Sequence, residues 1–204
     1  LIKNDFLDTP APALKPYSYP ELLSPAELVS ILREAGIVGM GGAAFPTDVK
    51  AKTGMNQVDT LILNACECEP YITADDVLLR TRPGDVLRGL ALLARILTPG
   101  RVVVAIEDNK PEAAALLRER MADFPGTELK VLPTRYPQGA EKQLIQAATG
   151  RQVPSGGLPR DVGCAVFNAA TAFAAYRAVY EGMPLIERVV TVTGEGVKQP
   201  RNLI

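Results

Sequence analysis

Apolar residues recur along this chain with two alternating periods. Residues 58–63, 101–106 and 128–132 are short runs rich in Val, Ile and Leu, which is typical of strands buried inside a sheet. Residues 84–97 instead carry apolar side chains every three or four positions, which predicts a helix with one core-facing stripe. Strands that alternate with helices indicate βαβ units, so we predict an α/β fold with a parallel sheet flanked by helices.

The other predicted elements follow from capping and breaking residues. The first helix begins after Ser24, where SPAE forms a capping box with Pro25 at the first helical position, and it ends at Gly36. Asn168 is a plausible N-cap for a long helix near the end of the chain. Further helices are predicted over residues 45–52, as a short turn, and over 75–79, 111–124 (capped by Asp108 or Asn109), 140–148 and 168–180, and a last strand over 188–193.

The chain divides into three parts by composition. Residues 1–23 are rich in Pro and predict an extended N-terminal arm, whereas residues 24–187 carry the α/β pattern. Residues 188–204 open on a fresh strand signal, and the chain lacks an initiator Met, so we expect a piece of a longer protein. With 204 residues, the chain is long enough for one substantial core that buries roughly 70% of its unfolded surface.

Composition and charge favour a small-molecule ligand. The chain is 47% apolar and has a net charge of −1, which argues against disorder, a nucleic-acid partner and a basic membrane-binding surface. No window approaches the roughly 18 consecutive apolar residues that a membrane span requires, and the first residues lack the layout of a signal peptide. We therefore expect a soluble domain with no direct membrane span.

The cysteine and histidine content excludes several kinds of site. The three cysteines, with no histidine, cannot by themselves make a four-ligand structural zinc site, and the CxC pair of Cys66 and Cys68 is shorter than an iron–sulfur CxxC signature. We expect reduced thiols, with redox or external-metal roles as the alternative. The absence of histidine also argues against Ser-His or Cys-His hydrolysis.

A glycine-rich stretch, GMGGAAFPTDVK at residues 39–50, is the leading candidate for ligand chemistry. Gly39, Gly41 and Gly42 allow tight turns, positive φ and close approach to backbone N–H groups, which suits a phosphate. Lys50 adds one positive charge, and Phe45 a rigid apolar edge. The alternative is a set of ordinary turns, because the strict GxGxxG fingerprint after a strand is not matched.

A second stretch, NACECEPY at residues 64–71, directly follows a predicted strand. Ligands of open α/β sheets bind at the carboxyl ends of the strands, so its polar side chains should face the ligand. Asn64 can donate and accept, while the Glu67 and Glu69 carboxylates would repel a phosphate. We infer that they face a hydrogen-bond-donating end, so the expected ligand is long, with an anionic end and a polar ring end.

Other polar residues lie at predicted loop-to-helix junctions and have plainer alternatives. Tyr136, Gly139 and Glu141 form a third junction, although Tyr136 alone is typical of a surface turn. Asn168, like Asp75 and Asp76, is typical of helix caps. Glu107, Asp108 and Asn109 form a polar cluster at the carboxyl end of a predicted strand, and helix capping explains two of the three. The case for a site depends on these junctions converging on one crevice.

At this point the motifs resemble a known family. GIVGMGGAAFPTDVK, VDTLILNACECEPYITADD, AIEDNKPEA, RYPQGAEKQLIQAATGRQVPSGG and LIERVVTVTG are similar, in order and spacing, to the RnfC family, the C subunits of membrane-bound Rnf electron-transport complexes. The resemblance runs from about residue 24 to about residue 194. The motifs GxGGxxFP, ExEP and YxxGxE are more distantly similar to the flavin subunit of respiratory complex I. The chain also resembles, distantly, a subunit of the sodium-pumping quinone reductase.

The resemblance implies a Rossmann-like domain that holds FMN noncovalently and exchanges hydride with NAD(H), with no protein acid or base and no metal required. The implied substrate residues are Phe45, as a platform for nicotinamide, and Glu67. Cys66 stands where complex I subunits have Asp, and Met40 stands where they have Arg. The implied cofactor residues are Gly39, Gly41, Gly42, Lys50, Asn64, Cys66, Glu67, Glu69, Tyr136, Gly139, Glu141, Asn168 and Thr171.

The resemblance also implies parts beyond this chain. Residues 188–204 would begin a truncated β-grasp domain, and 4Fe-4S clusters would lie in an absent C-terminal domain. The implied partners are the other subunits of a membrane redox complex and, indirectly, ferredoxin, at the cytoplasmic face of the membrane. Two alternatives stay open: a docking domain that keeps the fold without the flavin, and a metal-dependent phosphate-ester enzyme using Glu67, Glu69 and Asp75.

Overall fold

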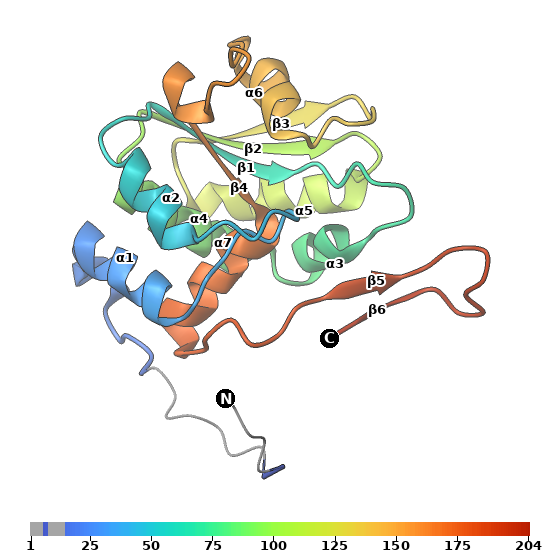
Figure 1. Ribbon diagram of the computed structural model, residues 1–204, viewed down its shortest axis with the longest axis horizontal. Coiled ribbons are helices and arrows are strands. Elements are labelled where there is room, and N and C mark those ends of the chain that lie inside the picture. Colours follow the sequence, from blue (N-terminus) through green and yellow to red (C-terminus); the bar gives the residue numbers. More distant parts are fainter. Residues whose placement is uncertain (1–5, 8–14) are drawn as a thin grey trace.

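The central sheet has four parallel strands, in the order β3-β2-β1-β4. The computed structural model describes residues 6–7 and 15–204 (Figure 1). The chain steps outward from β1 to β2 and β3, and then returns to place β4 on the other side of β1, so the strand order reverses between β1 and β4. The strands are β1 (Thr60–Ala65), β2 (Arg101–Glu107), β3 (Thr127–Leu132) and β4 (Cys164–Asn168).

The sheet is Rossmann-like, which confirms the predicted fold class. Leu61, Ile62 and Leu63 of β1 are completely buried, as expected for a central parallel strand covered on both faces. β4 was not predicted, because the pattern indicated only a loop before a helix at residue 168. Its five residues, CAVFN, are too few for a distinct period and are recognised as a strand only by pairing with β1.

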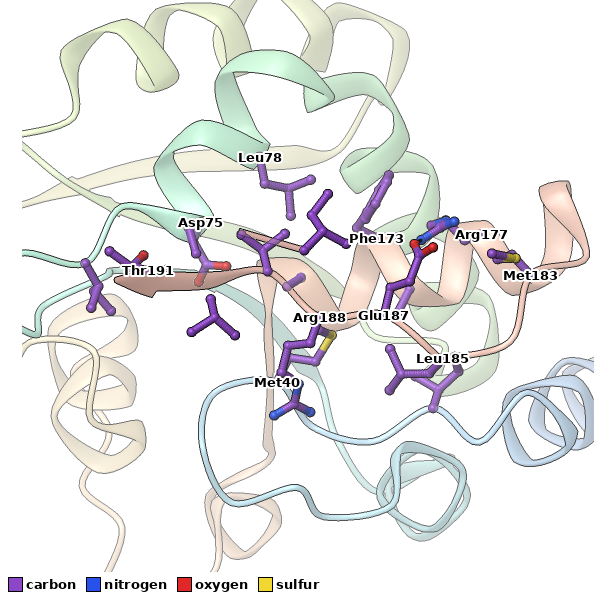
Figure 2. A pocket seen from close by; sticks show the side chains of 18 of the residues that line it. Met40, Asp75, Leu78, Phe173, Arg177, Met183, Leu185, Glu187, Arg188 and Thr191 are labelled. Carbon is purple, nitrogen blue, oxygen red and sulfur yellow. Dashed lines mark hydrogen bonds and ion pairs between the residues drawn. The ribbon is translucent and has the colours of Figure 1, made fainter. Parts of the chain in front are cut away.

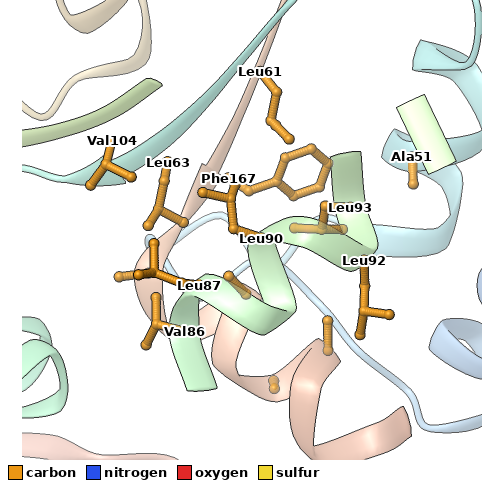
Figure 3. Packing of buried hydrophobic residues seen from close by; sticks show 14 of the residues in the cluster. Ala51, Leu61, Leu63, Val86, Leu87, Leu90, Leu92, Leu93, Val104 and Phe167 are labelled. Carbon is orange, nitrogen blue, oxygen red and sulfur yellow. The ribbon is translucent and has the colours of Figure 1, made fainter. Parts of the chain in front are cut away.

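Helices cover both faces of the sheet (Figure 1). On one face, α6 packs against a small apolar cluster that includes Ile62, Ala105 and Val166. The larger core lies on the opposite face, where Leu61, Leu63 and Phe167 point toward α4 (Figure 3). The helices are α1 (Pro25–Glu34), α2 (Thr47–Gly54), α3 (Ala74–Thr81), α4 (Pro83–Leu97), α5 (Pro111–Arg120), α6 (Glu141–Thr149) and α7 (Ala169–Tyr176).

Helix α7 is held in place by an unusually close crossing with α4. A Cβ atom on Gly89 of α4 would lie 1.8 Å from the carbonyl oxygen of Ala172, so only glycine permits this approach. Beyond Tyr176, the helix widens into a π-helical turn, Arg177–Glu181. The crossing fixes the start of α7 beside the carboxyl end of β4.

The predicted N-caps of α1 and α7 are present, whereas the predicted N-cap of α5 is not. Ser24 and Glu27 form the predicted capping box of α1, and Asn168 caps α7 with its side-chain oxygen. Helix α5 has no side-chain cap, since its N-cap residue is Lys110 and the Asp108 carboxylate instead accepts hydrogen bonds from Thr134. The sequence pattern could not show this contact, because Thr134 lies beyond the next strand.

The two ends of the chain lie outside the sheet. In the predicted arm, residues 1–5 and 8–14 lie outside the described residues, while the Arg95 guanidinium holds the rest by donating to the carbonyls of Pro20, Glu21 and Leu23. Near the C-terminus, β5 (Val190–Val192) and β6 (Arg201–Leu203) form an antiparallel hairpin, of which only the first strand was predicted. None of the helices described is long and apolar enough to cross a membrane.

Candidate functional site

Four segments meet where the strand order reverses. Asn64 ends β1 and Asn168 ends β4, and the two residues are partners in the parallel register. The glycine loop, defined as residues 39–45, and the loop between β3 and α6 also reach this edge of the sheet. Open α/β sheets bind ligands outside the carboxyl ends of their strands at such a reversal, so the predicted convergence is present.

The glycine loop is fastened at both ends. A bridge pairs Val38 with Pro46, and the backbone N–H of Gly39 donates to the Phe45 carbonyl at 2.8 Å. The N–H of Met40 donates to the hydroxyl of Thr171 at 2.9 Å, which holds the loop over the first turn of α7. The loop is therefore a fixed part of the site.

Gly41 and Gly42 differ in whether the backbone conformation requires glycine. Gly42 has a φ of +109°, a conformation that L side chains rarely adopt. Gly41 has no positive φ, and a Cβ atom there would meet only the Cβ of Asn168, at 3.6 Å, which is normal van der Waals contact. Neither packing nor a positive φ therefore requires glycine at position 41.

The side chain of Asn168 organises the start of α7. Its oxygen accepts hydrogen bonds from the backbone N–H groups of Ala170, at 2.8 Å, and Thr171, at 3.4 Å. Its amide nitrogen donates to the Asp75 carboxyl at 2.6 Å. The first turn of α7, with its partial positive charge, thus lies directly below the glycine loop, in an arrangement that suits an anion.

Asn64 joins the loop after β1 to the loop before α6. Its amide nitrogen donates to the Gly139 carbonyl at 2.8 Å, and its oxygen accepts from the Cys66 backbone N–H at 3.0 Å. A Cβ atom on Gly139 would lie 2.2 Å from the Cys66 carbonyl oxygen. Glycine at position 139 is therefore required by contact between the two loops.

Lys50 and Glu141 bring α2 and α6 together. The ammonium nitrogen of Lys50 lies 2.7 Å from a carboxylate oxygen of Glu141, and both side chains are partly exposed. The same nitrogen lies 5.2 Å from the centroid of the Phe167 ring, a cation–π contact. Lys50 is thus oriented from two sides, and its charge is available at the edge of the site.

Glu67 has a structural role, as a helix cap, that the sequence did not reveal. Its carboxylate accepts from the backbone N–H groups of Asp75, at 2.8 Å, and Asp76, at 3.3 Å, so Glu67 caps α3 in place of the predicted Asp75 or Asp76. Its side chain is 2% exposed and lies 3.4 Å from the Lys110 ammonium group. The predicted ligand contacts of Glu67 stay a prediction.

Burial and neighbouring charge change the protonation of two groups near the site. Burial, together with the Glu67 charge, raises the pKa of Asp75 to about 7. Burial, with the charges of Glu107 and Cys68, raises the pKa of Cys66 to about 12, so this thiol is protonated and unreactive at neutral pH. All three cysteines are free.

The remaining predicted residues lie on the exposed rim. The Phe45 side chain is 52% exposed on the glycine loop, and the Tyr136 side chain is 75% exposed on the loop before α6. Glu69 is also exposed, two residues beyond Glu67. Among the described residues, no three Cys, Asp or Glu side chains gather as metal ligands, so nothing supports the metal-dependent alternative.

A separate apolar cavity of about 420 Å³ lies on the other side of the glycine loop. It opens between α3, α7 and residues 183–191, with Met40, Leu78 and Phe173 on its walls (Figure 2). Of the predicted cofactor and substrate residues, only Glu67 lines it. The cavity borders the first turn of α7 at Ala170 and the start of α3 at Asp75, so it adjoins the strand reversal.

Comparisons with known proteins agree with this geometry. Residues 32–177 match the family described as the Nuo51 FMN-binding domain. In sequence, the chain is 50% identical over 177 residues to the C subunit of the ion-translocating oxidoreductase complex of Citrobacter koseri, covering 87% of this chain and 25% of the relative. The relative of the same name from Vibrio cholerae is 47% identical over 190 residues, covering 93% of this chain and 24% of the relative. The chain thus spans about a quarter of the length of these relatives.

A solved structure shows the same fold. A chain in the crystal structure of an NAD+-reducing [NiFe]-hydrogenase in the H2-reduced state superimposes with a TM-score of 0.67 and 24% identity, covering 80% of this chain and 33% of that one. The resemblance to the RnfC family is confirmed by the curated relatives, and FMN is the cofactor named by the matching family. The chain belongs to the family of Nuo51-type FMN-binding domains, and its curated relatives are C subunits of ion-translocating oxidoreductase complexes.

Proposed function

We propose that this domain binds FMN at the strand reversal and exchanges hydride between NAD(H) and the flavin, as the flavin module of an ion-translocating ferredoxin:NAD oxidoreductase. The main observation behind the proposal is the space beside Gly41, next to the first turn of α7, where an added Cβ atom would meet only the Cβ of Asn168. Neither packing nor a positive φ requires glycine there, whereas close approach of a ligand phosphate would.

The phosphate would lie at the end of the site formed by the glycine loop and α7. Gly39, Gly41 and Gly42 leave the loop backbone open to an anion, and Lys50 supplies a positive charge. Thr171 already accepts a hydrogen bond from Met40, so its hydroxyl hydrogen remains to be donated. Asn168 presents the N-terminus of α7 at the same end.

The ring and ribityl chain would extend toward the loops after β1 and before α6. Asn64 and Gly139 hold these loops together, Cys66 and Tyr136 lie on them, and Glu141 is the first residue of α6. Glu69 is exposed and accepts hydrogen bonds, which suits a ring edge that donates them. Because the oxygens of Glu67 cap α3, we expect Glu67 to shape the site from behind.

When bound, FMN would supply the hydride chemistry. The protein's own contribution would be positioning and exclusion of water, with the exposed ring of Phe45 as the surface on which nicotinamide stacks. Electrons would pass to 4Fe-4S clusters elsewhere in the subunit and, indirectly, to or from ferredoxin. We place the domain on the cytoplasmic face of the membrane, as a peripheral part of a complex with other subunits.

The test is a titration of the chain with FMN, followed by flavin fluorescence and absorbance, for the unmodified protein and Gly41→Val. We expect saturable binding by the first, loss of binding by the second and similar unfolding transitions for both. Gly196→Val is the matched control, because a Cβ atom there meets nothing within 4 Å and its φ is not positive. Unchanged affinity of folded Gly41→Val would move the phosphate elsewhere.

A second measurement addresses the nicotinamide. NADH added without oxygen to the FMN-loaded domain should bleach the visible absorbance of the oxidised flavin. Binding without bleaching would show that the flavin site is complete while the nicotinamide site is not. If the unmodified protein bound no FMN, the docking-domain alternative would replace the proposed function.

A further inference from the structure

One buried acid near the site has no structural partner. Glu107, the last residue of β2, is 1% exposed. Neither of its carboxyl oxygens has a hydrogen-bond partner among the residues that the structure describes. A buried polar group without a partner destabilises a fold, so its presence calls for a reason outside the fold.

The strand alternation shows which way Glu107 points. It lies two residues after Ala105 and so shares the face of the sheet that α6 covers, the face on which Ala105 packs with Ile62. The Cys66 thiol donates to the Ala105 carbonyl at 3.5 Å, which places the loop after β1 beside this face. Glu107 therefore faces the loops that carry Cys66 and Gly139.

The charges around Glu107 are consistent with its placement beside these loops. Its charge raises the pKa of both Cys66 and Cys68, on the loop after β1. On its own pKa, burial has the largest, raising effect, and the charges of Asp108 and Glu69 act in the same direction. The Lys110 ammonium group and the Arg135 backbone N–H, in the loop before α6, lower this pKa without overcoming burial, and the Arg135 N–H does not reach hydrogen-bond geometry with either carboxyl oxygen.

Lys110 does not neutralise Glu107 alone, because it also forms an ion pair with Glu67. Its ammonium group lies 3.4 Å from Glu67, whose own side chain is almost completely buried. One cation thus faces two buried acids, and Glu67 also has the N-terminal amides of α3. Of the two acids, Glu107 is the one whose hydrogen-bonding capacity remains unused.

We propose that Glu107 is a recognition residue of the same site, whose carboxyl group bonds the imide edge of a heteroaromatic ring, where an N–H lies beside a carbonyl. The inference rests on the proposed function, since the flavin ring has such an edge. A neutral carboxylic acid both accepts and donates, so it matches N–H and C=O with two parallel hydrogen bonds. A carboxylate could only accept and would leave the carbonyl unmatched.

The test compares FMN with N3-methyl FMN, which lacks the imide N–H, on the unmodified chain, Glu107→Gln and Glu107→Leu. The unmodified protein should bind FMN about tenfold or more tightly than the methylated ligand, and Glu107→Leu should bind the two equally. Gln also accepts and donates, so Glu107→Gln should keep the preference for FMN. Denaturant unfolding without ligand should show Glu107→Leu to be at least as stable as the unmodified chain.

The pH dependence gives an independent readout. The affinity of the unmodified protein for FMN, relative to that of Glu107→Gln, should fall as pH rises through the raised pKa of Glu107 and this group loses its proton. If folded Glu107→Leu still discriminates between the two flavins, the inference is wrong and the proposed function stands. If the unmodified protein binds neither flavin, the proposed function fails and this inference fails with it.

Discussion

Asn64 and Asn168 lie opposite each other at the carboxyl ends of neighbouring strands, and each uses its amide to hold a different loop or helix. Asn64 fastens the loop before α6 through the Gly139 carbonyl. Asn168 caps α7 and bonds Asp75 at the start of α3. This pair therefore sets the positions of both ends of the proposed cofactor site.

Asn168→Ala should weaken FMN binding as well as stability. The substitution removes the cap of α7 and the bond to Asp75, so we expect the free energy of unfolding to fall by about 1–2 kcal/mol. Ser24→Ala is the control, since it removes a similar cap from α1, away from the strand reversal. Denaturant unfolding should show losses in both variants, and FMN titration a loss in Asn168→Ala alone. Equal FMN affinity in the two variants would contradict a phosphate position at α7.

Gly139→Ala should separate the two loops that form the ring end of the site. Its Cβ atom would lie 2.2 Å from the Cys66 carbonyl oxygen, so the backbone must shift. We expect a loss of about 1–3 kcal/mol in unfolding free energy, with weaker FMN binding. Gly196→Ala, in open space, should change the unfolding free energy by less than about 0.5 kcal/mol. Similar stability of the two variants would mean that the loops can move apart without cost.

Lys50→Met should affect the cofactor far more than the fold. The ion pair with Glu141 is partly exposed, so its loss should cost less than about 1 kcal/mol in urea unfolding. If Lys50 faces the phosphate, FMN affinity should fall about tenfold at low salt and by less at high salt. Glu141→Gln breaks the same ion pair but keeps the Lys50 charge. Equal losses of affinity in both variants would assign the effect to the ion pair itself.

Asp75→Asn should change how stability depends on pH. The folded pKa of Asp75, about 7, lies above its ordinary value of 3.8, so between these values the folded protein keeps a proton that the unfolded chain releases. This contribution to stability is complete below about pH 4 and is lost as pH rises through about 7. Asp75→Asn should therefore match the unmodified protein near pH 4 and exceed it near pH 8 by an amount on the order of 1–4 kcal/mol.

Urea unfolding at several pH values checks this expectation. The titration of Glu107 occurs in both proteins and so cancels when the two stability curves are subtracted. Parallel curves for the unmodified protein and Asp75→Asn would show that the folded pKa of Asp75 is not raised.

Local sequence was sufficient for most of the elements. The apolar runs that form β1, β2 and β3, and the helical apolar stripes of α1 and α4, are patterns that can be recognised within each segment alone. The position of Asn64 at the ligand-binding edge was also predictable, because it follows the predicted strand β1 and ligands bind at the carboxyl ends of parallel strands. That Gly41 and Asn168 meet Asn64 there was not predictable in this way, because the glycine loop follows a helix and Asn168 ends a strand that was not predicted. The short strand β4 was missed, because five residues do not establish a period and its strand pairing comes from β1.

The roles of the polar side chains were decided by the tertiary structure. The sequence showed that Glu67 follows a strand, but only the fold brings it to the amide groups of α3 and to Lys110. In the same way, the sequence showed Glu107 only as an acid near the start of a helix. Its burial without a hydrogen-bond partner depends on the residues that the fold packs around it. The sequence by itself determined which segments form strands and helices and which face of each is apolar, because those depend on neighbours along the chain. The tertiary structure decided which polar groups are already satisfied and which are left for a ligand, because hydrogen bonding and desolvation depend on residues far apart in sequence.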